Sequence, residues 1–391
     1  MVIFLIIIYE MIKNERLNIS GISAAKLKDL IDLKLKYDGK LASEVESLKK
    51  ELTQKNDFSL DEILELLELP LEVLITVADH IRKEFVGEEV HLRGIIEFSN
   101  YCRKNCFYCG LRRNNKKLLR YRMSPEEIIE VAKIVVSSGC KTVVLQSGED
   151  LYYDRATISY IIREIKSSSP VAVTLSLGER SREDYAEWKK ARADRYLLKQ
   201  ETYNRELFRK LHPDDLYEER ILHRKWLKEL GYQVGTGNIV GLPGQQLLHI
   251  AEDILGFLKE DSDMIGIGPF IPHPDTPLWG FEPENLLELT LKTVAVTRIV
   301  TKDTLIPATT AMGTIDPEGR EKALLAGANV VMPNFTPVKY KPLYEIYPNK
   351  ICIFEGFGKC VGCLEGKIRK LGRTPSAGRG DRLKRAKRPL S

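Results

Sequence analysis

The chain has 391 residues, of which 43% are hydrophobic and 29% are charged, and its formal net charge is +5. This length and balance exclude a small scaffold held together by disulfides, and they favour one globular domain of enzyme size with extensions. The positive charge is concentrated in residues 367–391, which hold ten Lys or Arg and one Asp, so the rest of the chain is mildly acidic.

The chain begins with a short apolar run at residues 2–8. A membrane span needs roughly 20 apolar residues, so this run is too short to cross a bilayer. A secretory signal would have a positive residue before the run and small residues after it, and neither is present. We therefore expect a cytoplasmic protein without a membrane segment, and we interpret residues 1–10 as an over-long start before Met11.

Residues 20–86 are predicted to be helical, because apolar residues recur at spacings of three and four along residues 24–31 and 64–82. Ser59 and Glu62 have the spacing of a capping box, which marks the start of a helix. We therefore expect a helical extension over residues 1–87 that covers one end of the following domain.

From residue 88 to about 350, apolar strand-like runs alternate with helical segments. The expected strands are residues 90–98, 142–146, 171–177, 195–199, 234–240, 264–270, 305–309 and 330–333. The expected helices are residues 125–136, 156–166, 183–191, 218–230, 247–259, 286–300 and 318–326. This alternation predicts an α/β fold, a parallel (β/α)8 TIM-type barrel, whose active site would lie in the loops that follow the strand ends.

Three of the seven cysteines, Cys102, Cys106 and Cys109, follow the first expected strand with the spacing C-x3-C-x2-C. The odd number and the neighbouring Arg103 and Lys104 disfavour a disulfide, and no nearby His or Cys would complete a zinc site. Thiolates so close in sequence are typical ligands of iron–sulfur clusters. The pattern predicts a [4Fe-4S] cluster in which one iron lacks a protein ligand and can bind a small molecule.

With Tyr108 between its last two cysteines, this loop resembles the signature of the radical S-adenosylmethionine (SAM) enzymes. Residues 105–113, 145–150 and 307–314 resemble the [FeFe]-hydrogenase maturase HydE family, within the group that also holds biotin synthase and methylornithine synthase. The resemblance runs from about Phe58 to about Gly372. It implies a radical SAM barrel that binds a [4Fe-4S] cluster and SAM.

The resemblance also implies roles for residues near the strand ends. SAM-binding residues would be Tyr108, Ser147, Gly148, Glu149, Glu201 and Arg220. Substrate-binding residues would be Gln146, Ser176, Thr309, Thr310 and Ala311. Without the resemblance, residues 147–150 would be interpreted as an ordinary turn, Glu201 and Arg220 as a surface ion pair worth under about 1 kcal/mol, and the threonines as helix caps. Lys199 departs from the Arg that members often have, and it lacks the bidentate guanidinium.

A second cysteine group, Cys352, Cys360 and Cys363, lies in the segment 351–372. It suits a second [2Fe-2S] or [4Fe-4S] cluster or a structural metal, and the resemblance implies an auxiliary site that varies among members. Cys140 stands alone and is interpreted as a small buried hydrophobic residue.

Residues 373–391 form a basic tail with several Gly and Pro residues and no aromatic residue after Phe357. We expect it to be disordered. Nucleic-acid binding is the less favoured interpretation, because a basic run alone lacks aromatic residues for base stacking.

These features predict reductive cleavage of SAM to a 5′-deoxyadenosyl radical. By resemblance, the substrate would be an organometallic iron–thiolate complex used for the diiron subcluster of [FeFe]-hydrogenase. The partners would be an electron donor such as ferredoxin or flavodoxin and other hydrogenase maturases. Two alternatives stay open: a methylornithine synthase-like mutase, and an iron–sulfur carrier or scaffold without enzymatic activity.

Overall fold

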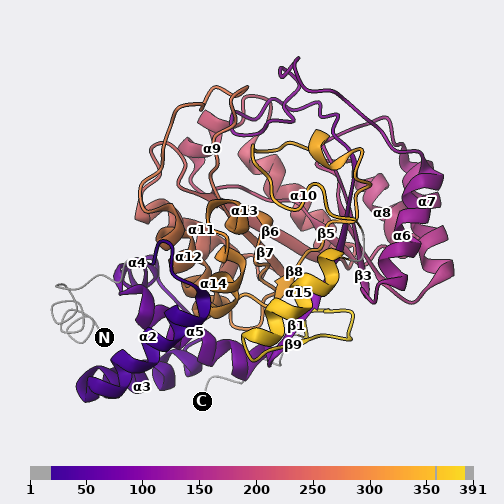
Figure 1. Ribbon diagram of the computed structural model, residues 1–391. Coiled ribbons are helices and arrows are strands. Elements are labelled where there is room, and N and C mark those ends of the chain that lie inside the picture. Colours follow the sequence, from indigo (N-terminus) through magenta and orange to yellow (C-terminus); the bar gives the residue numbers. More distant parts are fainter. Residues whose placement is uncertain (1–18, 357–358, 384–391) are drawn as a thin grey trace.

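The computed structural model describes residues 19–356 and 359–383, and a parallel barrel forms its centre (Figure 1). Six strands form one sheet in chain order, and every neighbouring pair is parallel. They are β2 (Gly94–Ser99), β3 (Thr142–Ser147), β4 (Ala172–Ser176), β5 (Arg195–Leu197), β6 (Gln233–Val240) and β7 (Met264–Pro269). Consecutive parallel strands place all their carboxyl ends, and the loops that follow them, at one end of the barrel.

The remaining part of the barrel wall is closed by short pairings. Leu305 bridges to Met264, Pro307 to Val330, and Asn334 to Ile95, each in parallel orientation. The expected strand at residues 305–309 is therefore only a pair of bridges, because Pro307 has no N–H to donate to a ladder. The (β/α)8 class is confirmed, although the seventh and eighth positions are short, with β8 limited to Val330–Val331.

The first expected strand is divided at Arg93. Its first half, β1 (Glu89–Leu92), pairs with β8 and with β9 (Thr374–Pro375), while its second half is β2. All six residues of β2 are buried, as expected for a strand covered on both faces.

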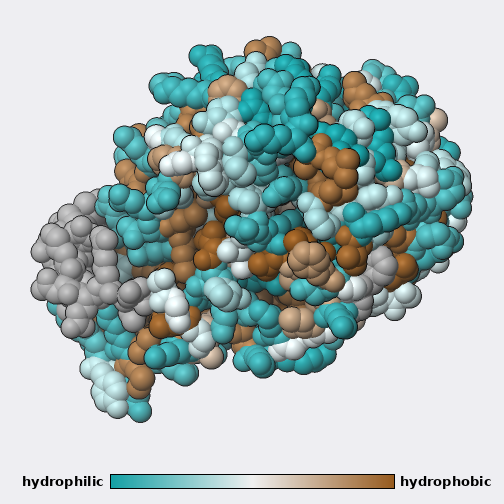
Figure 2. Space-filling view, turned by 45° about the horizontal axis from the view of Figure 1, so that its top comes forward, coloured by the Kyte–Doolittle hydropathy of each residue, from teal (hydrophilic) through white to brown (hydrophobic). Residues whose placement is uncertain are grey.

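Helices surround the barrel where the alternating pattern predicts them. They are α6 (Pro125–Ser137), α7 (Arg155–Ser168), α8 (Arg182–Lys190), α10 (Tyr217–Glu229), α11 (Leu247–Lys259), α12 (Leu286–Thr301) and α14 (Gly319–Leu325). Two shorter helices, α9 (Arg205–Leu211) and α13 (Thr310–Ile315), follow strand ends. Ser124, Asp154 and Ser181 each cap a helix by accepting from a backbone N–H. In Figure 2, hydrophilic residues cover most of the visible face, with apolar patches between them.

The N-terminal extension is helical as predicted: α2 (Ala24–Tyr37), α3 (Gly39–Gln54), α4 (Leu60–Glu68) and α5 (Leu71–Val86). The capping box of Ser59 and Glu62 is present. Helix α5 packs on α12, and α4 packs on α11 and α12. The extension therefore packs on the outside of these helices.

Residues 373–383, which we call the C-terminal strap, cross the end of the barrel where the strands begin. Arg373 is buried and donates to the carbonyls of Leu324 and Ala328. Arg379 pairs with Asp194 at 2.7 Å, and Arg382 pairs with Asp303 at 2.6 Å. The predicted disorder is thus wrong for residues 373–383; residues 384–391 lie outside the described part. The prediction of disorder relied on the low apolar content of this segment. The segment is held by ion pairs instead, and apolar content does not reveal them.

Among the described residues, no helix combines the length and the apolar content that a membrane crossing requires. The apolar run at residues 2–8 lies outside the described residues.

Candidate functional site

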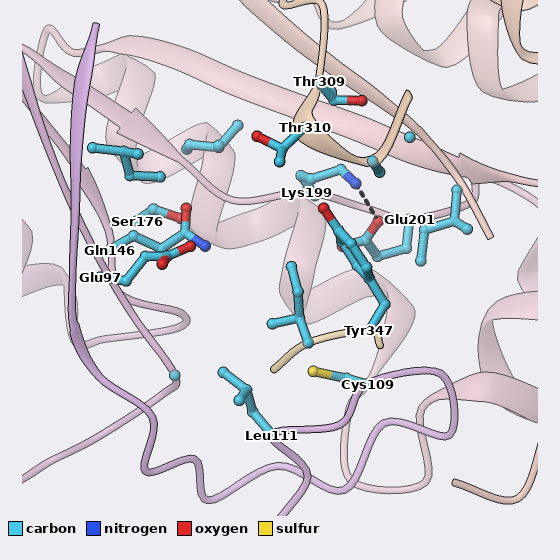
Figure 3. Close-up of a pocket in the computed structure, with 18 of the residues that line it drawn as sticks. Glu97, Cys109, Leu111, Gln146, Ser176, Lys199, Glu201, Thr309, Thr310 and Tyr347 are labelled. Carbon is cyan, nitrogen blue, oxygen red and sulfur yellow. Dashed lines mark ion pairs between the residues drawn. The ribbon is translucent and has the colours of Figure 1, made fainter. Parts of the chain in front are cut away.

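A cavity of about 410 Å³ lies inside the barrel and reaches the carboxyl ends of the strands (Figure 3). This volume is within the range of small-molecule sites. Every predicted residue of the first cluster, of the SAM site and of the substrate site lines it: Cys102, Cys106, Tyr108, Cys109, Gln146, Ser147, Gly148, Glu149, Ser176, Glu201, Arg220, Thr309, Thr310 and Ala311. The structure therefore brings these residues together, while their individual roles stay predictions.

Backbone contacts hold the cysteine loop against the strand ends. The N–H of Arg103 donates to the Glu149 carbonyl at 3.0 Å, and the Glu149 N–H donates to Cys102 Sγ at 3.3 Å. On the other side of the loop, the N–H of Phe107 donates to the Leu211 carbonyl at 2.9 Å. These bonds orient the three thiols toward the same cavity.

The thiols suit a cluster better than a single ion. Burial raises the pKa of Cys102, of Cys106 and of Cys109, the last to about 12. As free thiols they stay protonated at neutral pH, and a bound metal would replace the protons. Within the described chain, the three sulfurs do not form a group whose members all lie within 4.8 Å. Three neighbouring thiols spread in this way fit a polynuclear iron–sulfur group.

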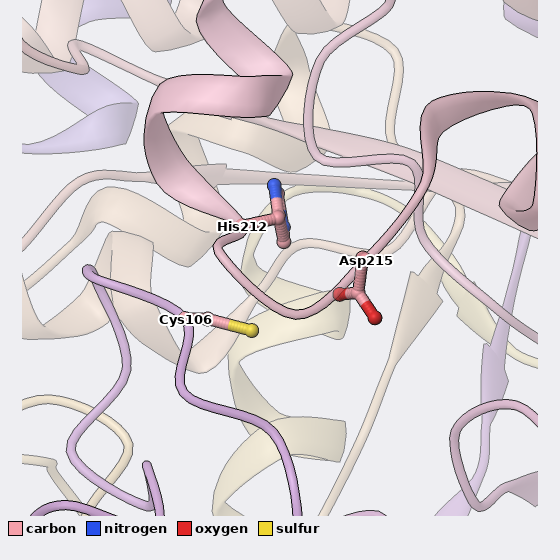
Figure 4. A group of neighbouring side chains, drawn as sticks. All are labelled: Cys106, His212 and Asp215. Atoms are coloured by element: carbon pink, nitrogen blue, oxygen red, sulfur yellow. The ribbon is translucent and has the colours of Figure 1, made fainter.

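Cys106, His212 and Asp215 have ligand atoms within 4.8 Å of one another (Figure 4). His212 already uses both ring nitrogens, since Nε2 contacts the Tyr108 hydroxyl at 2.9 Å and Nδ1 contacts the Phe208 carbonyl at 3.0 Å. Burial lowers the pKa of His212 to about 3, so the ring is neutral. We therefore assign no separate metal to this trio: His212 supports Tyr108, and Cys106 belongs to the cluster loop.

Gly148 allows two parts of the backbone to approach closely. A Cβ at this position would lie 2.2 Å from the Tyr101 carbonyl oxygen and 2.9 Å from Cys102 Cβ. The approach is thus to the cysteine loop itself, whereas the sequence suggested an approach to a ligand. The Glu149 carboxylate pairs with Arg103 and accepts from the N–H of Glu179.

Glu201 and Arg220 do not pair with each other. Glu201 pairs with Lys199 at 2.7 Å (Figure 3), and its backbone has φ of 69°, a strained value that functional sites often contain. Arg220 is buried and pairs with Glu179 at 2.7 Å and with Asp215 at 2.5 Å. The interpretation of Glu201 and Arg220 as a surface ion pair is therefore wrong.

The upper part of the cavity has walls of different character. Gln146 and Ser176 lie on one side with Glu97, and Thr309 and Thr310 lie opposite, above Lys199 (Figure 3). The hydroxyl oxygen of Thr309 is buried and has no hydrogen-bond partner. Such an orphan polar atom, in a cavity, suits a hydrogen bond to a ligand.

Glu97 and Tyr347 also line the cavity, although neither is among the site residues predicted from the sequence. Glu97 pairs with Lys350 and accepts from Asn334 Nδ2 at 2.9 Å. The sequence did contain a sign of a special role for Glu97, because it is a charged residue in the apolar run 94–98 and must have a partner when it is buried. Tyr347 carried no comparable local signal.

The second cysteine group lies outside this cavity, on and before α15 (Lys359–Lys370). The thiols of Cys352 and Cys360 share a hydrogen bond, which lowers the pKa of Cys352 to about 6 and raises that of Cys360. Cys363 is exposed one helical turn after Cys360. The structure thus pairs two of the three predicted ligands, and a cluster here stays a prediction. Cys140 is buried, as predicted.

Comparison with known proteins agrees with this geometry. Residues 96–255 match the family model of the radical SAM superfamily. The [FeFe] hydrogenase maturase subunit HydE of Thermotoga maritima is 59% identical over 312 residues, which cover 80% of this chain and 89% of that protein. The 3-methylornithine synthase of Methanosarcina acetivorans is 33% identical, over 71% of this chain and 79% of its own.

Solved structures support the fold. A crystal structure of methylornithine synthase superposes with a TM-score of 0.74 at 27% identity, covering 84% of this chain and 97% of that one. The maturase HydG from Carboxydothermus hydrogenoformans has a TM-score of 0.68 at 22% identity, over 90% of this chain and 83% of its own, and shows the fold alone. Because its three-cysteine loop ends a barrel strand and its identity to HydE spans four-fifths of its length, the chain belongs to the HydE family of radical SAM enzymes.

Proposed function

We propose that this chain acts in assembly of the diiron subcluster of [FeFe]-hydrogenase, with a [4Fe-4S] cluster held by Cys102, Cys106 and Cys109. The observation that carries the proposal is that the three thiols and all the predicted ligand-binding residues line one cavity. Cluster and SAM together supply a 5′-deoxyadenosyl radical by one-electron cleavage of SAM.

The chain's own residues would bind and orient SAM. Arg220, held by two carboxylates, would bind the SAM carboxylate, and Glu201 would bind the ammonium group. Tyr108 and the turn formed by Ser147, Gly148 and Glu149 would complete that site. Gln146, Ser176, Thr309, Thr310 and Ala311 would contact the substrate, for which the family suggests an organometallic iron–thiolate complex. Enclosure in the barrel would keep water away from the radical.

The partners follow from this chemistry. An electron donor such as ferredoxin or flavodoxin would reduce the cluster, and other hydrogenase maturases would supply the substrate and receive the product. We place this activity in the cytoplasm. An auxiliary cluster at Cys352, Cys360 and Cys363 would not be required for SAM cleavage.

The test is anaerobic reconstitution with iron and sulfide, followed by reduction with dithionite in the presence of SAM and measurement of 5′-deoxyadenosine. We expect product from the wild-type protein, none from Cys106→Ala, and most of it from Cys363→Ala as the matched control. Cleavage by Cys106→Ala would refute the assignment of the cluster.

The two alternatives give different results. A carrier or scaffold would hold iron but release no 5′-deoxyadenosine. A mutase would convert lysine to methylornithine, and we expect no such product here. Adding the protein to a hydrogenase maturation mixture that lacks HydE should restore hydrogen production, and Cys106→Ala should not.

A further inference from the structure

Four buried charges form a closed ring beside the cysteine loop. Lys104 and Arg220 alternate with Glu179 and Asp215, and none of the four side chains is more than 12% exposed. The sequence patterns predict no site role for Lys104, Glu179 or Asp215. The ring connects the loop that holds the cysteines with the helix that carries Arg220, since Lys104 lies between Cys102 and Cys106 and Arg220 lies in α10.

Each carboxylate divides its two oxygens between the two cations. Glu179 gives Oε2 to Lys104 at 2.9 Å and Oε1 to Arg220 Nε at 2.7 Å. Asp215 gives Oδ1 to Lys104 and Oδ2 to Arg220 Nη2 at 2.5 Å. Two cations therefore balance two anions, and a third carboxylate, Glu149, lies 3.6 Å from Lys104 Nζ.

This division leaves part of the Arg220 guanidinium free. It has five N–H groups, and Glu179, Asp215 and the Lys199 carbonyl use three of them. Arg220 also lines the cavity. One N–H on each Nη is therefore left for a ligand in the cavity while Lys104 shares the two carboxylates.

We infer that Lys104 is a positioning residue for SAM: by neutralising one side of Glu179 and Asp215, it leaves Arg220 free to bind the SAM carboxylate. The inference rests on the role proposed for Arg220. Without Lys104, two buried carboxylates would compete for one guanidinium, and a buried charge that loses its partner is strongly unfavourable. Both carboxylates would then depend on Arg220 alone, which would draw its remaining N–H groups to the acids, and excess negative charge would lie next to Cys106.

The first test compares Lys104→Met with Lys117→Met in the reconstituted protein. Lys117 lies on the same loop, is 82% exposed and pairs with Asp275 at 2.7 Å. We expect Lys104→Met to weaken SAM binding about ten-fold or more, the size of one charge-assisted hydrogen bond. The KM for SAM should rise while kcat at saturating SAM changes little, and Lys117→Met should behave as wild type. Normal SAM affinity in Lys104→Met at wild-type iron content would overturn the inference.

A second test removes one charge of each sign. In the Asp215→Asn background, Lys104→Met should cost little or no SAM affinity, because Glu179 and Arg220 then form a balanced pair. A loss as large as in the wild-type background would mean that Lys104 only supports the loop, and would also overturn the inference. If Lys104→Met alone retains too little iron, the double variant is compared with Asp215→Asn, and a ten-fold weaker SAM affinity of the double variant overturns the inference. Failure of the proposed function is a separate outcome, since the wild-type protein would then form no 5′-deoxyadenosine.

Discussion

Arg220 shows how strongly the surroundings of one side chain decide what its replacement would do. The guanidinium is enclosed by Glu179, Asp215 and the Lys199 carbonyl, and Asp215 lies within 4.8 Å of Cys106. Removing Arg220 therefore affects the SAM site and also leaves two buried carboxylates next to the cluster loop.

Arg220→Leu should lower SAM affinity about ten- to hundred-fold, at about 1.4 kcal/mol per decade. It should also destabilise the protein by about 3–5 kcal/mol, because two buried anions lose a partner. Equilibrium binding of SAM and urea unfolding would measure these effects. Glu201→Gln is the control for stability: it should also weaken SAM binding, through the ammonium group, but Glu201 pairs with Lys199 outside the ring, so the free energy of unfolding should change little. Unchanged stability of Arg220→Leu would mean that the ring is solvated.

Gly148→Ala should impair cluster uptake. The added Cβ would lie 2.2 Å from the Tyr101 carbonyl, so the cysteine loop must shift away from β3. We expect a lower iron content per chain after reconstitution, measured by colorimetric iron assay. Gly39→Ala is the matched control, because its Cβ would have no neighbour within 4 Å. Full iron loading of Gly148→Ala would show that the loop tolerates the shift.

At the scale of elements, the N-terminal extension is attached to the barrel partly through Lys302, at the end of α12. Its ammonium donates to the Leu52 carbonyl of α3 and lies 5.7 Å from the centre of the Phe58 ring and 5.8 Å from that of Phe85. Burial lowers the pKa of Lys302 to about 7 from 10.5. The folded protein thus gives up a proton that the unfolded chain keeps.

This shift predicts how stability depends on pH. Below pH 7 both states are protonated at Lys302, whereas between pH 7 and 10.5 only the unfolded chain binds the proton, so the group's contribution to stability rises with pH. From pH 7 to pH 9 the free energy of unfolding of wild type should gain about 2–3 kcal/mol relative to Lys302→Met. Urea unfolding of both proteins at the two pH values tests this. A constant difference would contradict the buried, neutral amine.

At the scale of the whole molecule, the C-terminal strap is the part whose order the amino-acid composition did not predict. It places the carbonyl of Gly380 on Arg93 at 3.0 Å and the carboxylate of Asp381 on Arg195. Both arginines are buried, and Arg93 also lines the cavity. The strap therefore supplies acceptors to two buried cations at the end of the barrel opposite the cysteine loop.

Truncation after Gly372 should lower the free energy of unfolding by at least about 3 kcal/mol, because Arg93 and Arg195 lose these partners. The melting temperature should fall with it. Truncation after Leu383 keeps every strap contact described above and serves as the control. Thermal unfolding at low and high salt would measure the effect, and high salt should narrow the difference because it screens the ion pairs. Equal melting temperatures for the two truncations would indicate that the strap does not stabilise the barrel.

The sequence by itself determined the barrel class, the positions of its helices and the cysteine loop. These are local properties. A short segment is enough to show the two-residue period of a strand or the 3.6-residue period of a helix, and it is enough to show the spacing of Cys102, Cys106 and Cys109. The predicted ligand-binding residues also reached one cavity, because residues that follow parallel strands meet at one end of a barrel.

Only the tertiary structure decided which charges meet. Lys104 and Arg220 share Glu179 and Asp215, Arg382 reaches Asp303, and Lys302 reaches the end of α3. Each of these contacts joins segments from different parts of the fold, so no local pattern contains it. Whether a charge is solvated or buried depends on such packing, and burial is what turns an ordinary ion pair into a constraint on the site.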